Sequence, residues 1–273
     1  MSLDHQPAWH DVTSRVLQNP IVFSDLDGTL LDHETYEYEA AAPALEQLKI
    51  RKIPLILASS KTAAELIPLR HRMGFDHCDA IVENGAGILP AGEMTGGDDS
   101  HLDNIFAILD AAPPAMRGHF AGFSQWSVDE VSARTGLAAD QARAAKQRQF
   151  SEVGQWSGSN NQWAEFQDYL TGQGLSVHRG GRFISLSFSA GKAARMQAIA
   201  EEHRRINGSA FVVALGDAPN DIAMLEAADL GIIIPNPGHQ GIAALDGEVT
   251  GSIIRADRPA PIGWNTAILE LIE

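Results

Sequence analysis

The sequence predicts an α/β protein whose core is a parallel sheet interrupted by a second, inserted α/β domain. Short apolar runs typical of buried strands alternate with segments of helical spacing near both ends of the chain. The middle of the chain lacks this alternation. We therefore expect the core to comprise residues 1–84 and 186–273, and the inserted domain to comprise residues 85–185.

The N-terminal half of the core is predicted from three apolar runs. Residues 21–23 form a short β-rich run that ends in the polar segment 24–29, as expected of a buried strand that leads into a loop. Further along, strands are predicted over 55–58 and 80–82, and helices over 40–52 and 62–73. Strand and helix thus alternate in this half.

The same alternation returns in the C-terminal half. Its strands are predicted over 211–215 and 231–234, and its helices over 193–205, 220–228 and 264–272. Two α/β halves therefore enclose the middle segment.

The middle segment has a different character. It contains a Gly/Asp-rich turn at 96–99, a Pro113-Pro114 break and three of the five tryptophans, Trp126, Trp156 and Trp163. Ser127 followed by Glu130 predicts a helix that begins with a capping box, and the Ala-rich stretch 138–149 predicts another helix. Residues 175–178 and 183–188 are expected to pair as strands around a turn at 180–181.

Charge and composition exclude several functions. The formal net charge is -15, with 35 acidic and 20 basic side chains, so the surface should repel nucleic acid and anionic membranes. No apolar run approaches the ~20 residues that span a bilayer, and no secretory signal is indicated. The single cysteine, Cys78, cannot form an internal disulfide, which favours a reducing compartment. We expect a cytoplasmic protein.

Two aspartates follow the first predicted strand. Asp25 and Asp27 stand two residues apart, and Gly28 allows the backbone to turn tightly enough to direct both carboxylates into one cleft. Paired carboxylates in one place imply a cation or a proton. With Mg²⁺ bound, one carboxylate can be both ligand and nucleophile while the other transfers the proton of the leaving oxygen. The alternative interpretation is an ordinary Asp/Gly-rich surface turn without a catalytic role.

A second acidic segment follows the predicted strand 211–215. Asp217 could be a direct Mg²⁺ ligand, with Asn220 and Asp221 orienting it, because parallel strands end at the same edge of a sheet. A simple helix N-cap is the alternative here. Ser59, which follows the strand over 55–58, could donate to a phosphoryl oxygen, and Lys192 could supply a fixed positive charge for it.

These four segments resemble the motifs of the haloacid dehalogenase superfamily of phosphatases. The resemblance implies a Rossmann-like core with an inserted α/β cap, Mg²⁺ as cofactor, and a phospho-aspartate intermediate. It implies that Asp25 attacks phosphorus, that Asp27 acts as acid and then base, and that Asp25, the Asp27 carbonyl and Asp217 bind the metal. Ser59 and Lys192 would then hold the phosphoryl oxygens.

More narrowly, the chain resembles mannosyl-3-phosphoglycerate phosphatases, and this resemblance extends into the cap. It is carried by residues 59–62, 83–86, 135–137, 148–152 and 179–183. The implied substrate is a small anionic phosphorylated sugar acid, mannosyl- or glucosyl-3-phosphoglycerate. Relatives tend to continue Ser151-Glu152 with Pro-Phe, whereas this chain has Val153-Gly154. The resemblance therefore does not determine which sugar the substrate carries.

The cap offers candidate substrate ligands. A phosphoglycerate unit carries a carboxylate beside its phosphate, and an arginine fork is the side chain that best matches such a group. Arg148, Arg179 and Arg182 are the candidates, and Glu152 could accept hydrogen bonds from sugar hydroxyls. Exposed arginines and a solvated glutamate are the alternative interpretation.

Three other functions remain open. A different sugar phosphatase or a phosphosugar mutase of the same superfamily would have an indistinguishable core. A signalling receiver also has an acceptor aspartate, acidic metal ligands and a lysine on an α/β sheet, although Asp27 argues against it. A catalytically silent binding module would not need the whole acidic set. The sequence does not determine the oligomeric state.

Overall fold

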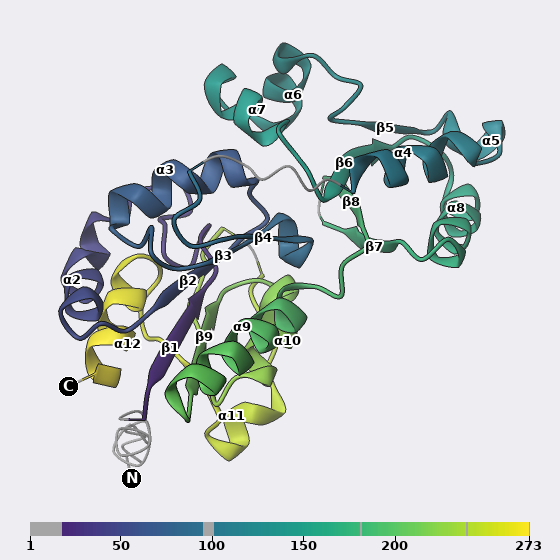
Figure 1. The fold of residues 1–273 in the computed structure, drawn as a ribbon. Coiled ribbons are helices and arrows are strands. Elements are labelled where there is room, and N and C mark those ends of the chain that lie inside the picture. The colour runs from purple at the N-terminus through teal and green to yellow at the C-terminus, as the bar shows by residue number, and fades with distance from the viewer. Residues whose placement is uncertain (1–17, 95–100, 181, 239, 273) are drawn as a thin grey trace, which may run out of the picture.

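The computed structural model describes residues 18–94, 101–180, 182–238 and 240–272. In this part of the chain the strands form two separate sheets, each with its own helices (Figure 1). The larger sheet has seven strands in the order β11-β10-β9-β1-β2-β3-β4. Its strands are β1 (Pro20–Ser24), β2 (Leu55–Ala58), β3 (Ala80–Val82), β4 (Gly87–Leu89), β9 (Phe211–Gly216), β10 (Leu230–Ile233) and β11 (Ile253–Arg255).

The larger sheet is parallel except for its last pair, in which β4 runs antiparallel to β3. This confirms the predicted parallel core. At the centre, β1 pairs with β9 and Ser24 stands opposite Leu215. The loops that begin at Asp25 and Asp217 therefore leave the sheet at the same edge, side by side.

Helices cover both faces of this sheet. Figure 1 shows α2 and α12 on one side and α9 and α10 on the other. The Trp264 indole, on α12, donates to Ser24 Oγ over 2.9 Å and so ties this helix to the end of β1. The helices are α2 (Ala42–Ile50), α3 (Ala63–Met73), α9 (Lys192–Asn207), α10 (Ile222–Ala227), α11 (Asp246–Thr250) and α12 (Ile262–Ile272), with short 3₁₀ turns η1 (Glu39–Ala41), η2 (Glu83–Gly85) and η3 (Pro219–Asp221).

The smaller sheet has the order β5-β6-β8-β7 and is antiparallel throughout. Its strands are β5 (Phe120–Gly122), β6 (Ser151–Trp156), β7 (Ser176–Arg179) and β8 (Ile184–Ser187), and its helices are α4 (Leu102–Ala111), α5 (Pro114–Arg117), α6 (Val128–Thr135), α7 (Ala139–Ala145) and α8 (Asn160–Gly172). One apolar cluster joins α4 and α8 to the sheet through Leu109, Phe166 and Leu186. The predicted pairing of 175–178 with 183–188 is confirmed by β7 and β8.

Local sequence signals explain several helix ends. The predicted capping box at Ser127 and Glu130 is present at the start of α6, and a second one at Thr62 and Glu65 begins α3. The predicted helix over 138–149 is too long, because α7 ends at Ala145. The turn at 96–99 and Gly181 lie outside the described residues.

The polypeptide crosses between the two sheets twice, and the second crossing, after β8, contacts the 3₁₀ turn η2 between β3 and β4. Gly85 has φ +89°, and a Cβ atom on it would lie 2.3 Å from the Gly191 carbonyl carbon, so only glycine can occupy this position. Ser189 Oγ donates to the Gly85 carbonyl over 2.7 Å. Because β4 belongs to the larger sheet and β8 to the smaller one, we place the proposed domain boundaries after Leu89 and after Ser187, a few residues later than the sequence suggested.

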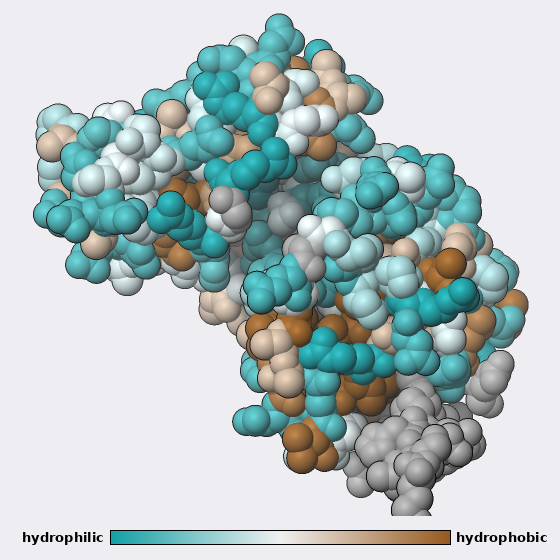
Figure 2. All heavy atoms as spheres, turned by 180° about the vertical axis from the view of Figure 1, so that it is seen from behind, coloured by the Kyte–Doolittle hydropathy of each residue, from teal (hydrophilic) through white to brown (hydrophobic). Residues whose placement is uncertain are grey.

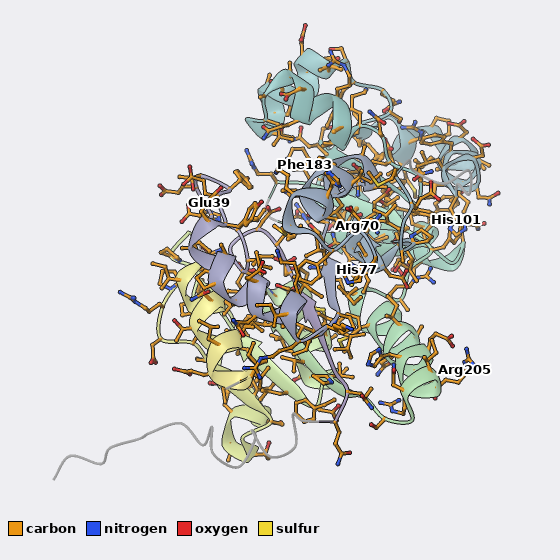
Figure 3. The ribbon with its side chains drawn as sticks, turned by 60° about the vertical axis from the view of Figure 1, so that its left-hand side comes forward. Glu39, Arg70, His77, His101, Phe183 and Arg205 are labelled. Atoms are coloured by element: carbon orange, nitrogen blue, oxygen red, sulfur yellow. The ribbon has the colours of Figure 1, made fainter. Side chains whose placement is uncertain are left out.

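Arg70 is a charged side chain that is buried in the interior of the protein. Figure 3 shows Arg70 within the protein, where its guanidinium donates to the carbonyls of Cys78, Leu89 and Pro90. Seen from behind, the surface is largely hydrophilic (Figure 2). Among the described helices, none combines the length and apolarity that crossing a bilayer requires.

Candidate active site

Three aspartates from distant parts of the chain meet at the carboxyl edge of the larger sheet. Asp25 follows β1, while Asp217 and Asp221 follow β9. All three are buried, and one carboxylate oxygen from each lies within 4.8 Å of the others. The expectation that parallel strand ends would bring these two segments together is therefore met.

Lys192 lies inside this cluster. It is the first residue of α9, and its Nζ donates to Asp25 Oδ1 over 2.5 Å and to Asp221 Oδ1 over 2.7 Å. Burial by itself would lower the pKa of Lys192, but the two carboxylates outweigh it and raise the pKa above its ordinary value. The ammonium group therefore stays charged.

The charges at this site do not balance. The three carboxylates and Lys192 sum to -2 when all are ionised. Burial is the largest cause that raises the pKa of Asp25 well above its usual range; Lys192 opposes the increase, and the neighbouring carboxylates add to it. One divalent cation would cancel the excess charge and favour the ionised form of Asp25.

Backbone and side-chain donors fix the two aspartates after β9. Asp221 Oδ2 accepts from the amides of Asp217 and Ala218, both over 3.2 Å, so it shapes the loop on which Asp217 stands. Asp217 Oδ1 accepts from Thr29 Oγ1 over 2.8 Å, and its Oδ2 accepts from Asn236 Nδ2 over 2.7 Å. Asn236 follows β10, and sequence reasoning did not find it.

Asp27 is the more exposed acid of the first loop. Its Oδ2 accepts from Lys61 Nζ over 2.7 Å, and the Asp27 and Lys61 side chains are 34% and 16% exposed. Burial lowers the pKa of Lys61, but Asp27 outweighs this effect and raises it. The second oxygen, Oδ1, has no hydrogen-bond partner among the described residues. Sequence reasoning gave Lys61 no role; its place in the loop after β2, next to β1, was the available signal.

Ser59 is the first residue after β2 and lies in the same loop as Lys61. Its side chain is buried, and its hydroxyl accepts from the Lys61 amide over 3.2 Å. The Ser59 amide donates to the Ile81 carbonyl over 2.9 Å, which fixes the loop against β3. Among the described residues the hydroxyl hydrogen has no acceptor, so it is available for one.

Glu83, which sequence reasoning also missed, lies where the two sheets join. It is 1% exposed and has φ +52°, a strained value for a residue with a side chain. Its carboxylate accepts from the Gln149 amide over 2.8 Å, the Phe150 amide over 3.2 Å and Ser151 Oγ over 2.6 Å. One buried carboxylate of the core therefore holds the start of β6.

Arg148 also lies at this contact between the two sheets, which is called the joint below. Its Nε lies 3.5 Å from Glu83 Oε2 and donates to Ser151 Oγ over 3.0 Å, while Nη2 donates to the Ser60 carbonyl over 3.3 Å. This guanidinium connects the cap to the loop that carries Ser59 and Lys61.

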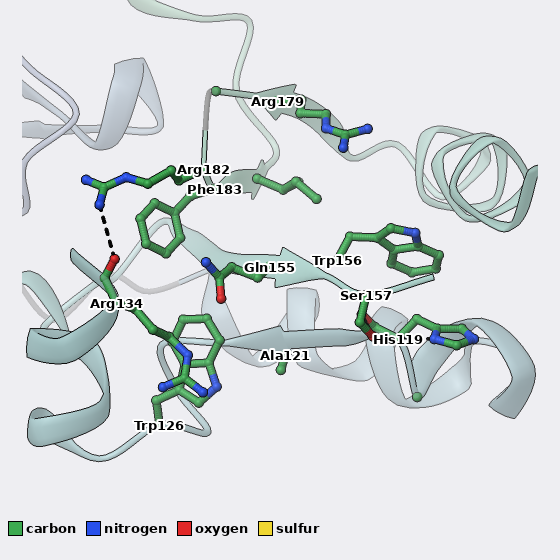
Figure 4. Close-up of a pocket in the computed structure, with 13 residues that line it drawn as sticks. His119, Ala121, Trp126, Arg134, Gln155, Trp156, Ser157, Arg179, Arg182 and Phe183 are labelled. Atoms are coloured by element: carbon green, nitrogen blue, oxygen red, sulfur yellow. Dashed lines mark hydrogen bonds between the residues drawn. The ribbon is translucent and has the colours of Figure 1, made fainter. Parts of the chain in front are cut away.

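Arg179 and Arg182 line a cavity in the cap (Figure 4). Its volume is about 440 Å³, and Figure 4 shows the aromatic rings of Trp126, Trp156 and Phe183 around it. Arg182 donates to the Arg134 carbonyl over 3.3 Å, and Arg179 lies over the Trp163 ring, 5.4 Å from its centre.

Two further predicted residues lie apart from that cavity's lining. Glu152 is 2% exposed and accepts from the Ser124 amide over 3.1 Å and from Ser124 Oγ over 2.7 Å. Burial raises the pKa of Glu152 above its usual value, and the bonds from Ser124 partly oppose this. Asn220 is exposed, and its Nδ2 donates to Asn84 Oδ1 over 3.4 Å.

The donor set at the sheet edge suits a hard divalent cation. Asp25, Asp217 and Asp221 offer only carboxylate oxygens, which Mg²⁺ prefers. Asp221 is already engaged by Lys192 and two amides. Asp25 and Asp217 are therefore the better candidates for direct ligands, with Asp221 holding the loop of Asp217. The sequence also predicted the Asp27 carbonyl as a ligand and Asn220 as a second orienting residue, but Asn220 points to Asn84 instead.

Comparisons with known proteins identify the family of the chain. A family described as haloacid dehalogenase-like hydrolase matches residues 22–252. The chain is 32% identical, over 92% of its length and 97% of the relative, to a glucosyl-3-phosphoglycerate/mannosyl-3-phosphoglycerate phosphatase of Methanococcoides burtonii.

Solved structures share the fold at low identity. A phosphatase of the haloalkanoate (HAD) enzyme superfamily from Bacteroides thetaiotaomicron superposes with a TM-score of 0.66 at 18% identity, covering 92% of this chain and 94% of the other. The sucrose-phosphatase of Synechocystis gives 0.59 at 16% identity, covering 93% and 98%. With fold, motifs and family match in agreement, this chain belongs to the haloacid dehalogenase-like hydrolases.

Proposed function

We propose that this phosphoric monoester hydrolase releases phosphate from mannosyl- or glucosyl-3-phosphoglycerate by way of a phospho-aspartate on Asp25. The observation that carries the proposal is the buried cluster of Asp25, Asp217, Asp221 and Lys192 at one sheet edge. The relative from M. burtonii supports the choice of substrate.

Asp25 is the proposed nucleophile because it is buried beside a fixed ammonium group. An anionic phosphate would be repelled by three carboxylates, and Lys192 offsets part of that repulsion. Mg²⁺, bound by Asp25, the Asp27 carbonyl and Asp217, would supply the remaining positive charge. The carboxylate of Asp25 attacks phosphorus, the sugar-acid oxygen leaves, and water then cleaves the acyl phosphate.

Asp27 is the proposed acid and base. Its partly exposed carboxyl can reach the substrate, and Lys61 holds one of its oxygens while the other lacks a partner among the described residues. Asp27 gives a proton to the leaving oxygen and takes one from the attacking water. Ser59, with its hydroxyl hydrogen available, would donate to a phosphoryl oxygen.

The cap is the proposed source of specificity. Arg179 and Arg182 border a cavity with polar and aromatic walls, which suits a glycosyl group and a carboxylate. Arg148, just before β6, and Glu152, within β6, are also proposed substrate ligands; both are buried and bonded to protein groups in this structure, so they would have to exchange those bonds for substrate. Closure of the cap over the acidic cluster would exclude water during the reaction.

The test is a panel of phosphate esters assayed for phosphate release with Mg²⁺ present or chelated. We expect the highest kcat/KM with a glycosyl-3-phosphoglycerate, no turnover without a divalent cation, and no turnover in Asp25→Asn, which should remain folded. Retained turnover in Asp25→Asn would overturn the mechanism.

The same panel separates the remaining candidates. A higher kcat/KM with a simple sugar phosphate would make the protein a general sugar phosphatase, as the sucrose-phosphatase fold allows. An isomerised phosphosugar in place of free phosphate would indicate a mutase. A stable phospho-protein without turnover would indicate a receiver.

A further inference from the structure

We propose that Asn236 is a positioning residue that holds Asp217 in place for a divalent cation, an inference that rests on the metal site of the proposed function. Asn236 follows β10, the strand next to β9, and is 8% exposed. Its Nδ2 donates to Asp217 Oδ2 over 2.7 Å. Three neighbouring strands thus contribute to the site, through Asp25, Asp217 and Asn236.

A second hydrogen bond fixes which way the Asn236 amide faces. Its Oδ1 accepts from the Gly238 amide over 2.8 Å, so the carbonyl end of the side chain points to its own loop. The NH₂ end must then face Asp217. The orientation follows from these two bonds, since an amide rotated by half a turn would bring two oxygens together at Asp217 and two N–H groups together at Gly238.

The loop after β1 leaves room for this contact. Gly28 has φ +82°, and a Cβ atom on it would lie 2.1 Å from Asn236 Nδ2 and 2.7 Å from Asp217 Oδ2. The glycine that lets Asp25 and Asp27 turn into the cleft therefore also makes space for the Asn236–Asp217 pair. Any larger residue would push the amide away from the carboxylate.

The chemistry of the donors matters as much as their position. Thr29 and Asn236 donate to different oxygens of Asp217, and both are uncharged. They restrict rotation of the carboxylate without cancelling its negative charge, which is what a cation ligand requires. Lys192, by contrast, offsets the charge of Asp25 and Asp221.

The experiment is a calorimetric titration of the full chain with MgCl₂, in the absence of substrate. We expect Asn236→Ala to raise the Kd for Mg²⁺ by roughly 10–100-fold, the usual effect of removing a partner of a metal-binding residue. Asn236→Ser, which is too short to span the same distance, should also raise the Kd and serves if the alanine variant does not fold.

Asn265→Ala is the matched control. Asn265 Oδ1 accepts from the Ala44 amide over 3.0 Å and joins α12 to α2, so its loss should lower the melting temperature and leave the Kd unchanged. An unchanged Kd in a folded Asn236 variant would overturn the inference while leaving the proposed function intact, as would an equal rise in Asn265→Ala. Wild-type protein that binds no Mg²⁺ would overturn both.

Discussion

Replacing Glu83 by glutamine should destabilise the protein more than any change to its surface charges. The Glu83 carboxylate is fully enclosed and accepts from three donors of residues 149–151, with the Arg148 guanidinium 3.5 Å away. Glutamine keeps the shape but offers one oxygen instead of two. It turns an NH₂ group toward donors and leaves Arg148 without its counter-charge.

The size of the effect follows from burial. The side chains of Glu83 and Arg148 are 1% and 7% exposed, so solvent screens this pair very little. Removing one partner of a buried ion pair costs about 3–5 kcal/mol, whereas an exposed pair such as Arg205 with Glu202 is screened by solvent and contributes little. We expect Glu83→Gln to lower the free energy of unfolding by about 3–5 kcal/mol.

Urea unfolding of a double-mutant cycle measures this coupling. Arg148→Met should also destabilise, and the double variant should lose less stability than the two single losses combined, by about 0.5–3 kcal/mol. Glu202→Gln is the exposed control. Strict additivity, or a loss in Glu83→Gln no larger than in Glu202→Gln, would refute a buried charge pair at the joint.

Three further outcomes are expected. Asp27→Asn should lower kcat/KM, which reports on phosphoryl transfer to Asp25, by about 10²–10⁴ with alkyl phosphates and by much less with p-nitrophenyl phosphate, whose leaving group needs no proton; equal losses of kcat/KM with both substrates would contradict its role as acid. Lys192→Met should lower the free energy of unfolding in urea by about 3–5 kcal/mol, because Asp25 and Asp221 would then lack the positive charge between them. Mg²⁺ should restore part of this loss, and unchanged stability would contradict the charge pairing. Burial raises the pKa of the Cys78 thiol to about 11, so the folded state holds this proton more tightly than the unfolded state. The raised pKa therefore contributes to the free energy of unfolding. This contribution is complete below about pH 9 and is lost as the pH rises to about 11, with a slope of no more than ~1.4 kcal/mol per pH unit. Cys78→Ala should therefore lose less stability than wild type over that range, and identical pH slopes would contradict the assignment.

Sequence alone could predict the acidic cluster because it depends on a general rule. Strands of a parallel sheet end at the same edge, so Asp25 and Asp217 meet wherever β1 and β9 are neighbours. Short apolar runs and capping boxes likewise predict most strands of the core and the start of α6.

Partners that depend on detailed side-chain geometry could not be predicted. Asn236 lies 19 residues from Asp217, and nothing in its local pattern distinguishes it from a loop asparagine. In the sequence Glu83 resembles an ordinary acidic residue of a turn, because its partners, residues 149–151, come close only when the cap is folded against the core. The strands β4 and β11 were also missed. They have three residues each, like the correctly predicted β3, but β3 is apolar throughout, whereas β4 begins with a glycine and β11 ends with an arginine.

The central claim is that Asp25 itself becomes phosphorylated. The most direct measurement uses Asp27→Asn with p-nitrophenyl phosphate, which should allow the acyl phosphate to form but slow its hydrolysis. After acid quenching and borohydride reduction, peptide mass spectrometry should find homoserine at position 25. Release of p-nitrophenol while Asp25 stays unmodified, or reduction at any other carboxylate, would contradict the account.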